Sequence, residues 1–228
     1  GDVSSSCSGF DANSVSRTWT RVRVLGNEVD CEGTFGGWTL NWFGADVFNN
    51  LILAGNQVAM GSTGIHTGLF YGNRGSVTVL NSVVHDNFVR ANQAFGGVFY
   101  SESNSLSVVN TVLSSNQLGI DVYNSSFPGA VFGYASGGDL ALSYSTFWGN
   151  SSSSGEGFWA AGASRDIVAE ANNNTLTPSY TDVSGEDPST WDFSLEAGSE
   201  LIDAGDPAIE DPDGSTSDIG AFGGPQSF

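Results

Sequence analysis

Short apolar runs bounded by asparagine or glycine recur along the chain, and they predict strands. The pattern appears in four segments that align with one another: 50–56, 81–87, 110–116 and 144–150. Their final asparagines are 31, 29 and 34 residues apart. No stretch keeps apolar residues at i, i+3, i+4 and i+7 over helical length. The hydrophobic pattern therefore indicates an all-β fold built from one recurring unit.

A second series of strand-like segments runs in step with the first. It comprises 68–71, 97–100, 130–133 and 157–160, with spacings of 29, 33 and 27 residues. A shared period with two or more short strands describes one coil of a β-solenoid. Each coil would stack on its neighbours at about 4.8 Å and form parallel sheets. We therefore predict a parallel β-helix of roughly 29–34 residues per coil. An antiparallel sandwich is the competing architecture, but it does not predict a regular period.

The repeats divide the chain into three parts of one structural domain. Residues 46–165 hold the clear coils, and a fainter copy of the repeat lies between Arg21 and Asn27. We expect residues 1–45 to form an N-terminal cap. Residues 166–228 are expected to supply the last coil and an acidic tail.

Two columns of residues fall at equivalent positions of successive coils. The asparagines form either a polar binding row or an internal ladder that fixes a turn, and we favour the ladder. Apolar residues flank each position of the aromatic column on both sides. The column is therefore either part of the core or a solvent-facing platform for sugar rings. The asparagine column is Asn56, Asn87, Asn116 and Asn150, and the aromatic column is Phe70, Phe99, Phe132 and Trp159.

Composition narrows the function classes. The chain has 228 residues, no lysine, six arginines and 25 acidic residues, for a formal charge of −19. Nucleic acid is excluded as a partner because phosphate binding needs a basic patch. No membrane span and no signal peptide are visible, so we expect a mature, processed chain of a secreted protein. In that setting Cys7 and Cys31 are expected to form a disulfide worth about 3 kcal/mol.

The last 50 residues contain a motif of Asp, Gly and Pro. It reads DAGDP at 203–207, DPDGS at 211–215 and DIGAFGGP at 218–225. This run resembles the closing region of secreted and surface-anchored bacterial proteins of the pectate-lyase-like superfamily, which are right-handed parallel β-helices. The resemblance implies a right-handed coil and an extracellular or cell-surface location. That superfamily includes lyases, hydrolases, adhesins and structural subunits, so it does not decide the activity.

Oxygen ligands gather in the same tail. Carboxylates and a hydroxyl in a short glycine-containing loop suit Ca²⁺, and the alternative is a solvated acidic turn. The loop is no EF-hand, because Phe222 occupies the twelfth position, where glutamate is required. The candidate ligands are Asp206, Asp211, Asp213, Ser215 and Asp218.

Catalytic signals are weak in this sequence. A lyase needs a basic residue beside a carboxylate–calcium cluster, and a glycoside hydrolase needs two carboxyl groups roughly 5–10 Å apart. The coil positions equivalent to Asp86 are Gly55, Ser115 and Gly149, so the register supplies no carboxyl pair. His85 beside it is interpreted as an exposed structural residue.

Three function hypotheses remain. The leading one is a non-catalytic extracellular β-helix with a structural or adhesive role, whose open ends allow head-to-tail assembly of its own copies into filaments. The second is a small polysaccharide lyase or glycoside hydrolase. The third is a carbohydrate-binding module for extracellular polysaccharide, which requires the Phe70 column to face solvent.

Overall fold

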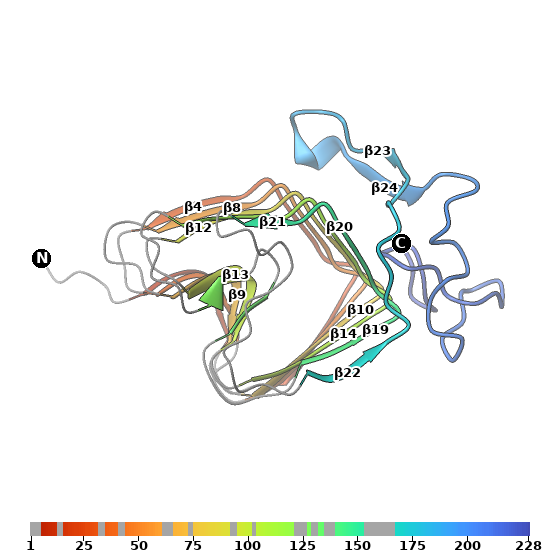
Figure 1. Ribbon diagram of the computed structural model, residues 1–228, viewed down its shortest axis with the longest axis horizontal. Helices are drawn as coiled ribbons and strands as arrows, with labels where there is room; N and C mark the ends of the chain where they lie inside the picture. The colour runs from red at the N-terminus through yellow and green to blue at the C-terminus, as the bar shows by residue number, and fades with distance from the viewer. Residues whose placement is uncertain are drawn as a thin grey trace, which may run out of the picture.

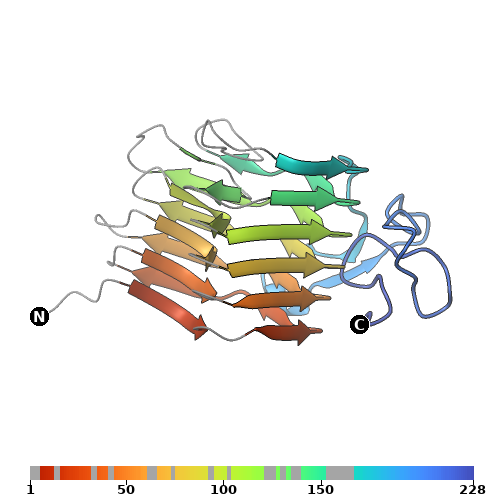
Figure 2. The same ribbon diagram turned by 90° about the horizontal axis from the view of Figure 1, so that it is seen from below.

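The chain folds as a right-handed parallel β-helix (Figure 1). In Figure 1 the chain passes counter-clockwise around the axis, and each coil lies nearer to the viewer than the one before it. Figure 2 shows the coils stacked one above another, with the C-terminal segment beside them. The computed structural model describes residues 6–12, 16–31, 35–40, 44–60, 66–72, 75–91, 95–101, 104–120, 127–128, 132–134, 140–152 and 167–228.

Four parallel sheets form the walls of the helix. Sheet 1 contains β2 (Arg17–Thr20), β6 (Ala45–Asn49), β10 (Gly75–Leu80), β14 (Asn104–Val109), β19 (Leu140–Ser143) and β22 (Ile167–Ala171). Sheet 2 contains β3 (Arg23–Leu25), β7 (Ile52–Ala54), β11 (Val83–His85), β15 (Val112–Ser114) and β20 (Thr146–Trp148). Sheet 3 contains β4 (Glu28–Cys31), β8 (Gln57–Met60), β12 (Phe88–Ala91), β16 (Gln117–Ile120) and β21 (Ser151–Ser152). Sheet 4 contains β1 (Ser6–Ala12), β5 (Phe35–Leu40), β9 (His66–Gly72), β13 (Phe95–Ser101), β17 (Phe127–Pro128) and β18 (Phe132–Tyr134).

Residues one sequence repeat apart occupy the same position in successive coils. Val83 of β11 pairs with Ile52 of β7 on one side and with Val112 of β15 on the other. The faint repeat between Arg21 and Asn27 belongs to a full coil, because β2, β3 and β4 pair in register with the following coil. The coils therefore extend back into the segment 1–45, as the faint repeat predicts, and a cap within that segment stays a prediction.

Two sharp corners bound sheet 2, and both depend on left-handed backbone. The first corner has positive φ at Arg21, Asn50, Asn81, Asn110 and Tyr144, and the second at Gly26, Gly55, Asp86, Ser115 and Gly149. Asparagine, aspartate and glycine tolerate this region better than other residues. The asparagine- and glycine-bounded repeat in the sequence is thus a pair of turns five residues apart around a three-residue strand.

The predicted asparagine ladder lies just after the second corner. Each side-chain Nδ2 donates to the Oδ1 of the next rung at 2.9 Å, from Asn27 through Asn56, Asn87 and Asn116 to Asn150. Each Oδ1 also accepts the backbone N–H of the preceding rung. Because Asn56, Asn87 and Asn116 are buried within the stack, the hydrogen bonds of these middle rungs satisfy groups that water cannot reach. The column is an internal structural feature.

The main core lies inside the coils. Alternate residues of each strand point inward, among them Leu53, Val84 and Leu113 of sheet 2 and Val58, Val89 and Leu118 of sheet 3. They form one continuous cluster with Leu69, Val98 and Phe99 of sheet 4.

The acidic tail runs back along the outside of sheet 2. It contains β23 (Tyr180–Asp182), the 3₁₀ turn η1 (Pro188–Thr190) and β24 (Asp192–Leu195), with β23 and β24 antiparallel. The outward residues of sheet 2, including Ile52, Val83 and Val112, pack against Tyr180, Phe193, Leu201 and Ile219 in a second core cluster. The middle strands β7, β11 and β15 of sheet 2 are therefore buried on both faces, and the tail is part of the folded body.

The first-corner asparagines anchor the tail. Asn50 Nδ2 donates to the carbonyls of Ala221 and Gly223, both at 2.8 Å, and Asn110 Oδ1 accepts the N–H of Asp206 at 2.7 Å. At the first coil, Arg21 Nε donates to the carbonyl of Gln226 at 3.0 Å. The closing motif, with Gln226 just after it, is thus a strap that crosses the stack from the coil of Asn110 to the first coil.

Candidate functional site

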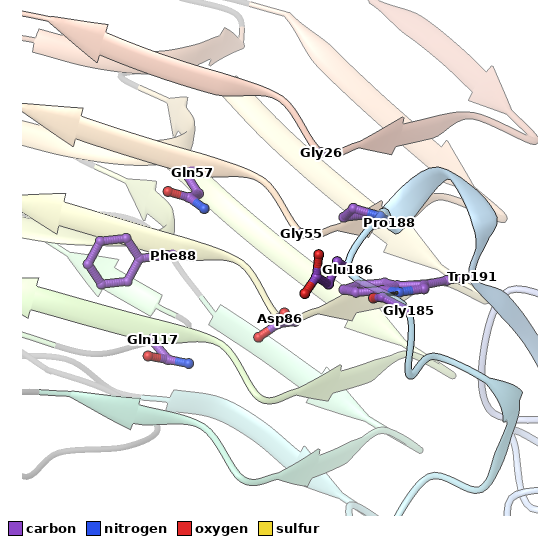
Figure 3. A pocket seen from close by; sticks show the side chains of 10 residues that line it. All are labelled: Gly26, Gly55, Gln57, Asp86, Phe88, Gln117, Gly185, Glu186, Pro188 and Trp191. Carbon is purple, nitrogen blue, oxygen red and sulfur yellow. Dashed lines mark hydrogen bonds between the residues drawn. The ribbon is translucent and has the colours of Figure 1, made fainter.

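A groove opens where the tail crosses the second corner (Figure 3). Its volume is about 460 Å³, within the range of about 300–1,000 Å³ usual for small-molecule sites. We call it the corner groove. Its lining residues come from the second corner (Gly26, Gly55, Asp86), the outer face of sheet 3 (Gln57, Phe88, Gln117) and the tail (Gly185, Glu186, Pro188, Trp191).

The residue at each position of the second corner determines how closely the tail can pack there. Gly55 has a φ of +62°, and a Cβ built on it would lie 2.8 Å from the Cβ of Pro188. The close contact therefore requires glycine at this turn, whereas Asp86 and Ser115 adopt the same left-handed angle in later coils. The next residue of the same row is Asp86, and its carboxylate lines the groove.

The tail wall is built by a short, internally bonded loop. Asp187 caps η1 through a hydrogen bond from the N–H of Ser189 at 2.9 Å. The indole Nε1 of Trp191 donates to the carbonyl of Gly185 at 2.6 Å. The indole ring also makes edge contacts with His85 and Phe193, at centroid distances of 5.7 and 6.0 Å. Trp191 is therefore held in place before any ligand arrives.

The opposite wall is a column on the outer face of sheet 3. Phe88 pairs in register with Gln57 on one side and Gln117 on the other. The ring of Phe88 lies over Gly119, where an added Cβ would be 3.2 Å from its Cζ. Figure 3 shows the face of this ring turned toward the viewer. Phe88 is half-buried, and both glutamines are exposed.

Partial burial changes two ionisable groups here. Desolvation raises the pKa of Asp86 above its ordinary range. Desolvation also lowers the pKa of His85 to about 4, because its ring lies beneath Tyr180, Trp191 and Phe193. The expectation of an exposed His85 is wrong: the tail covers it, and its Nδ1 contacts Ser114 Oγ at 2.8 Å.

The sequence did not reveal this groove. The coil register shows no acidic partner for Asp86, yet Glu186 of the tail lines the same groove. The two residues are 100 positions apart and belong to different kinds of structure. The outward column of Gln57, Phe88 and Gln117 could have been found by writing the coils in register one position after each ladder asparagine.

The structure describes only one side chain of the predicted aromatic column, that of Phe99. Phe70, Phe99 and Phe132 occupy matching positions on β9, β13 and β18. Phe99 is 3% exposed and belongs to the main core, so this residue cannot serve as a sugar platform. The side chains of Phe70 and Phe132, and the whole of Trp159, lie outside the described part of the chain.

The predicted calcium ligands fall in the strap. Asp211 accepts the N–H groups of Gly224 and Asp218, and Asp213 Oδ1 accepts from Ser215 Oγ at 2.6 Å. Asp206 instead bonds to the N–H of Ala208 at 2.9 Å. Desolvation, followed by neighbouring carboxylates, raises the pKa of Asp218. Among the described residues, no group of three or more His, Cys, Asp or Glu side chains is arranged to hold a metal ion, and Ca²⁺ stays a prediction.

Cys7 lies on β1 and Cys31 on β4, but their side chains lie outside the described residues, so the disulfide stays a prediction. In the described part of the chain no helix is long and apolar enough to cross a membrane. Comparison with protein-family models, curated proteins and solved structures gives no match.

Proposed function

We propose that this chain is a non-catalytic extracellular β-helix protein with a structural or adhesive role, and that its copies associate end to end. The observation that carries the proposal is the open core at the first coil. Trp19, Val24 and Val29 are only partly buried there. Their register partners in the next coil, Phe48, Leu53 and Val58, are 5%, 0% and 0% exposed.

At the outer edge of the first coil, backbone N–H groups of sheets 2 and 3 also have no described strand to pair with. In the later coils the N–H of Ile52 donates to the carbonyl of Val22, and the N–H of Gln57 donates to that of Asn27. The equivalent donors in the first coil are Arg23 and Glu28, and the described chain has no earlier strand in sheets 2 and 3. An edge of this kind is a template for pairing with another chain.

The asparagine ladder ends there with an unused acceptor. Asn27 donates through its N–H and Nδ2, and no described residue donates to its Oδ1. A further coil would bring an asparagine to this position. A second copy is the partner of matching chemistry, because it offers parallel strands at the same spacing.

Charge favours a head-to-tail arrangement. Three of the six arginines, Arg17, Arg21 and Arg23, lie in the first coil, whereas the chain as a whole carries a formal charge of −19. The same coil also carries Glu28 and Asp30, so its charge is nearly balanced, and the acidic surface of another copy meets less repulsion here than from a strongly acidic surface. The resemblance of the strap to secreted members of the pectate-lyase-like superfamily supports an extracellular location.

Sedimentation velocity and electron microscopy over a range of protein concentrations would test the proposal. We expect concentration-dependent end-to-end oligomers or fibres. Glu28→Pro removes an N–H that the monomer does not use, at the first residue of an edge strand, where proline is tolerated. This variant should stay folded and monomeric, while the control Glu28→Ala associates as wild type. Monomers at every concentration, or unchanged association of a folded Glu28→Pro variant, would overturn the proposal.

A further inference from the structure

We propose that the corner groove is a binding site for a neutral saccharide. The site does not depend on end-to-end association, because the groove lies on the side of the stack, at sheet 3 and the tail. It also differs from the aromatic column of sheet 4, where Phe99 is buried in the core.

The first requirement of a sugar site is an aromatic surface that water can reach. Phe88 meets it: the ring is half-buried, lies over Gly119 and shows its face in Figure 3. Sugar rings present C–H groups on one face, and burying them against an aromatic ring removes apolar surface from water. Trp191 and Pro188 add apolar surface on the opposite wall.

The second requirement is polar groups that are free to bond a ligand. The amides of Gln57 and Gln117 lie on the strands beside Phe88, about 4.8 Å away on each side. Both side chains are exposed and make no hydrogen bond to a described residue. An amide offers both a donor and an acceptor, which matches the two roles of a sugar hydroxyl.

The charge of the groove selects among saccharides. Asp86 and Glu186 supply acceptors only, and no described residue of the lining is cationic. A ligand must therefore bring hydrogen-bond donors to these two carboxylates, and each hydroxyl group of a sugar supplies one. Uronic acids and sulfated sugars would meet two carboxylates on a chain of charge −19, so an anionic polysaccharide is disfavoured.

The walls are fixed before binding. Trp191 is held by its bond to the Gly185 carbonyl and by its ring contacts, and Pro188 sits on the Gly55 corner. A prearranged site loses less conformational entropy when its ligand binds. These features suit recognition of one or two sugar units along a longer chain.

Calorimetric titration with neutral gluco-, xylo- and manno-oligosaccharides tests the proposal. Oligogalacturonate, an amine-bearing chitosan oligomer and a lysine-rich peptide serve as the comparison ligands. We expect saturable binding of at least one neutral oligosaccharide and none of oligogalacturonate. Phe88→Ser should weaken that binding roughly tenfold or more, because truncating an aromatic anchor is costly. Phe88→Tyr should preserve it.

Matched controls separate the groove from the rest of the surface. Ser151→Ala changes the same sheet 3 column outside the groove and should leave binding unchanged. Failure of every neutral oligosaccharide to bind, or equal binding by a folded Phe88→Ser variant, would overturn the proposal. Binding confined to the chitosan oligomer or the peptide would also overturn it. Cleavage of a bound neutral oligosaccharide would support the site and overturn the non-catalytic function proposed above.

Discussion

Two rows of asparagine run along the stack with the same spacing, and the two rows differ in whether they also bond to the strap. Asn56, Asn87 and Asn116 bond to one another inside the coils. Asn50, Asn81 and Asn110 have φ values of 56°, 45° and 50° at the first corner, where the strap crosses the stack. Asn110 Nδ2 also donates to Asn81 Oδ1 at 3.0 Å, but Asn50 and Asn110 bond to the strap as well. The sequence period therefore gives the position of both rows, but it names a partner only for the bonds between copies.

The difference arises because the coils repeat and the tail occurs once. A ladder asparagine meets a copy of itself one coil away, so the sequence period already names its partner. Asn50 instead bonds to carbonyls 171 and 173 residues away, in a tail that occurs once. Only the folded structure brings that partner into view.

The largest expected effect is at the ladder. Asn87→Ala removes the acceptor for the N–H and Nδ2 of Asn56 and the donors to Leu53 and Asn116. Asn87 is 0% exposed, so these partners would remain buried and unpaired. We expect a loss of about 3–5 kcal/mol in the free energy of unfolding, measured by urea denaturation. A loss below about 1 kcal/mol would contradict the structural role of the ladder.

The next effect depends on pH and reports on the strap. His85 has an unfolded-state pKa of 6.5 and a folded-state pKa of about 4. As the pH falls through this interval, the unfolded chain takes up a proton that the folded chain does not, and stability decreases. The loss should approach about 3 kcal/mol at most.

The His85→Gln variant should lack this part of the pH dependence. The raised pKa values of Asp86 and Asp218 act in the opposite sense, and both residues remain in the variant. The measurement is therefore the difference between wild type and variant at pH 7 and at pH 4.5. Parallel stability curves would contradict burial of His85 beneath the tail.

A smaller and more local effect is expected at the corner row. Asn50→Gly keeps the left-handed turn but removes the bonds to the carbonyls of Ala221 and Gly223. We expect a loss of about 1–2 kcal/mol. Hydrogen exchange should rise in residues 217–228 and remain slow in the coils. Equal acceleration in both regions would show that the two asparagine rows are not separable.

The smallest effect compares two glycines of the second corner. Gly149→Ala should cost about 1 kcal/mol from its left-handed backbone alone, because its added Cβ meets nothing closer than 3.7 Å. Gly55→Ala places a Cβ 2.8 Å from the Cβ of Pro188 and closer still to its Cγ, so we expect roughly 1 kcal/mol more. Faster exchange of the Thr190 amide in Gly55→Ala alone would locate the difference at η1, and equal costs for the two variants would contradict the close packing of Pro188.

The sequence predicts those features of the fold that follow from the coil repeat. The coil length, the parallel sheets and the ladder at Asn56, Asn87, Asn116 and Asn150 all follow from one period. The resemblance of the closing motif added the handedness. What the repeats do not control was missed: the return of residues 177–228 along sheet 2, the burial of His85, and the meeting of Asp86 with Glu186 in one groove. Phe99 was undecided because both it and Val98 are apolar, and the structure buries both.

Hydrogen exchange of the unmodified protein tests most directly whether the tail is part of the folded body. The N–H groups of Gly205, Ile219 and Gly220 donate to the carbonyls of Ser217, Leu201 and Asn110 at 2.8, 2.9 and 2.9 Å. We predict that these amides exchange as slowly as those of Ile52, Val83 and Val112 in sheet 2. Exchange of the three tail amides at the rate of an unstructured peptide, beside protected coils, would contradict the strap and the groove that it builds.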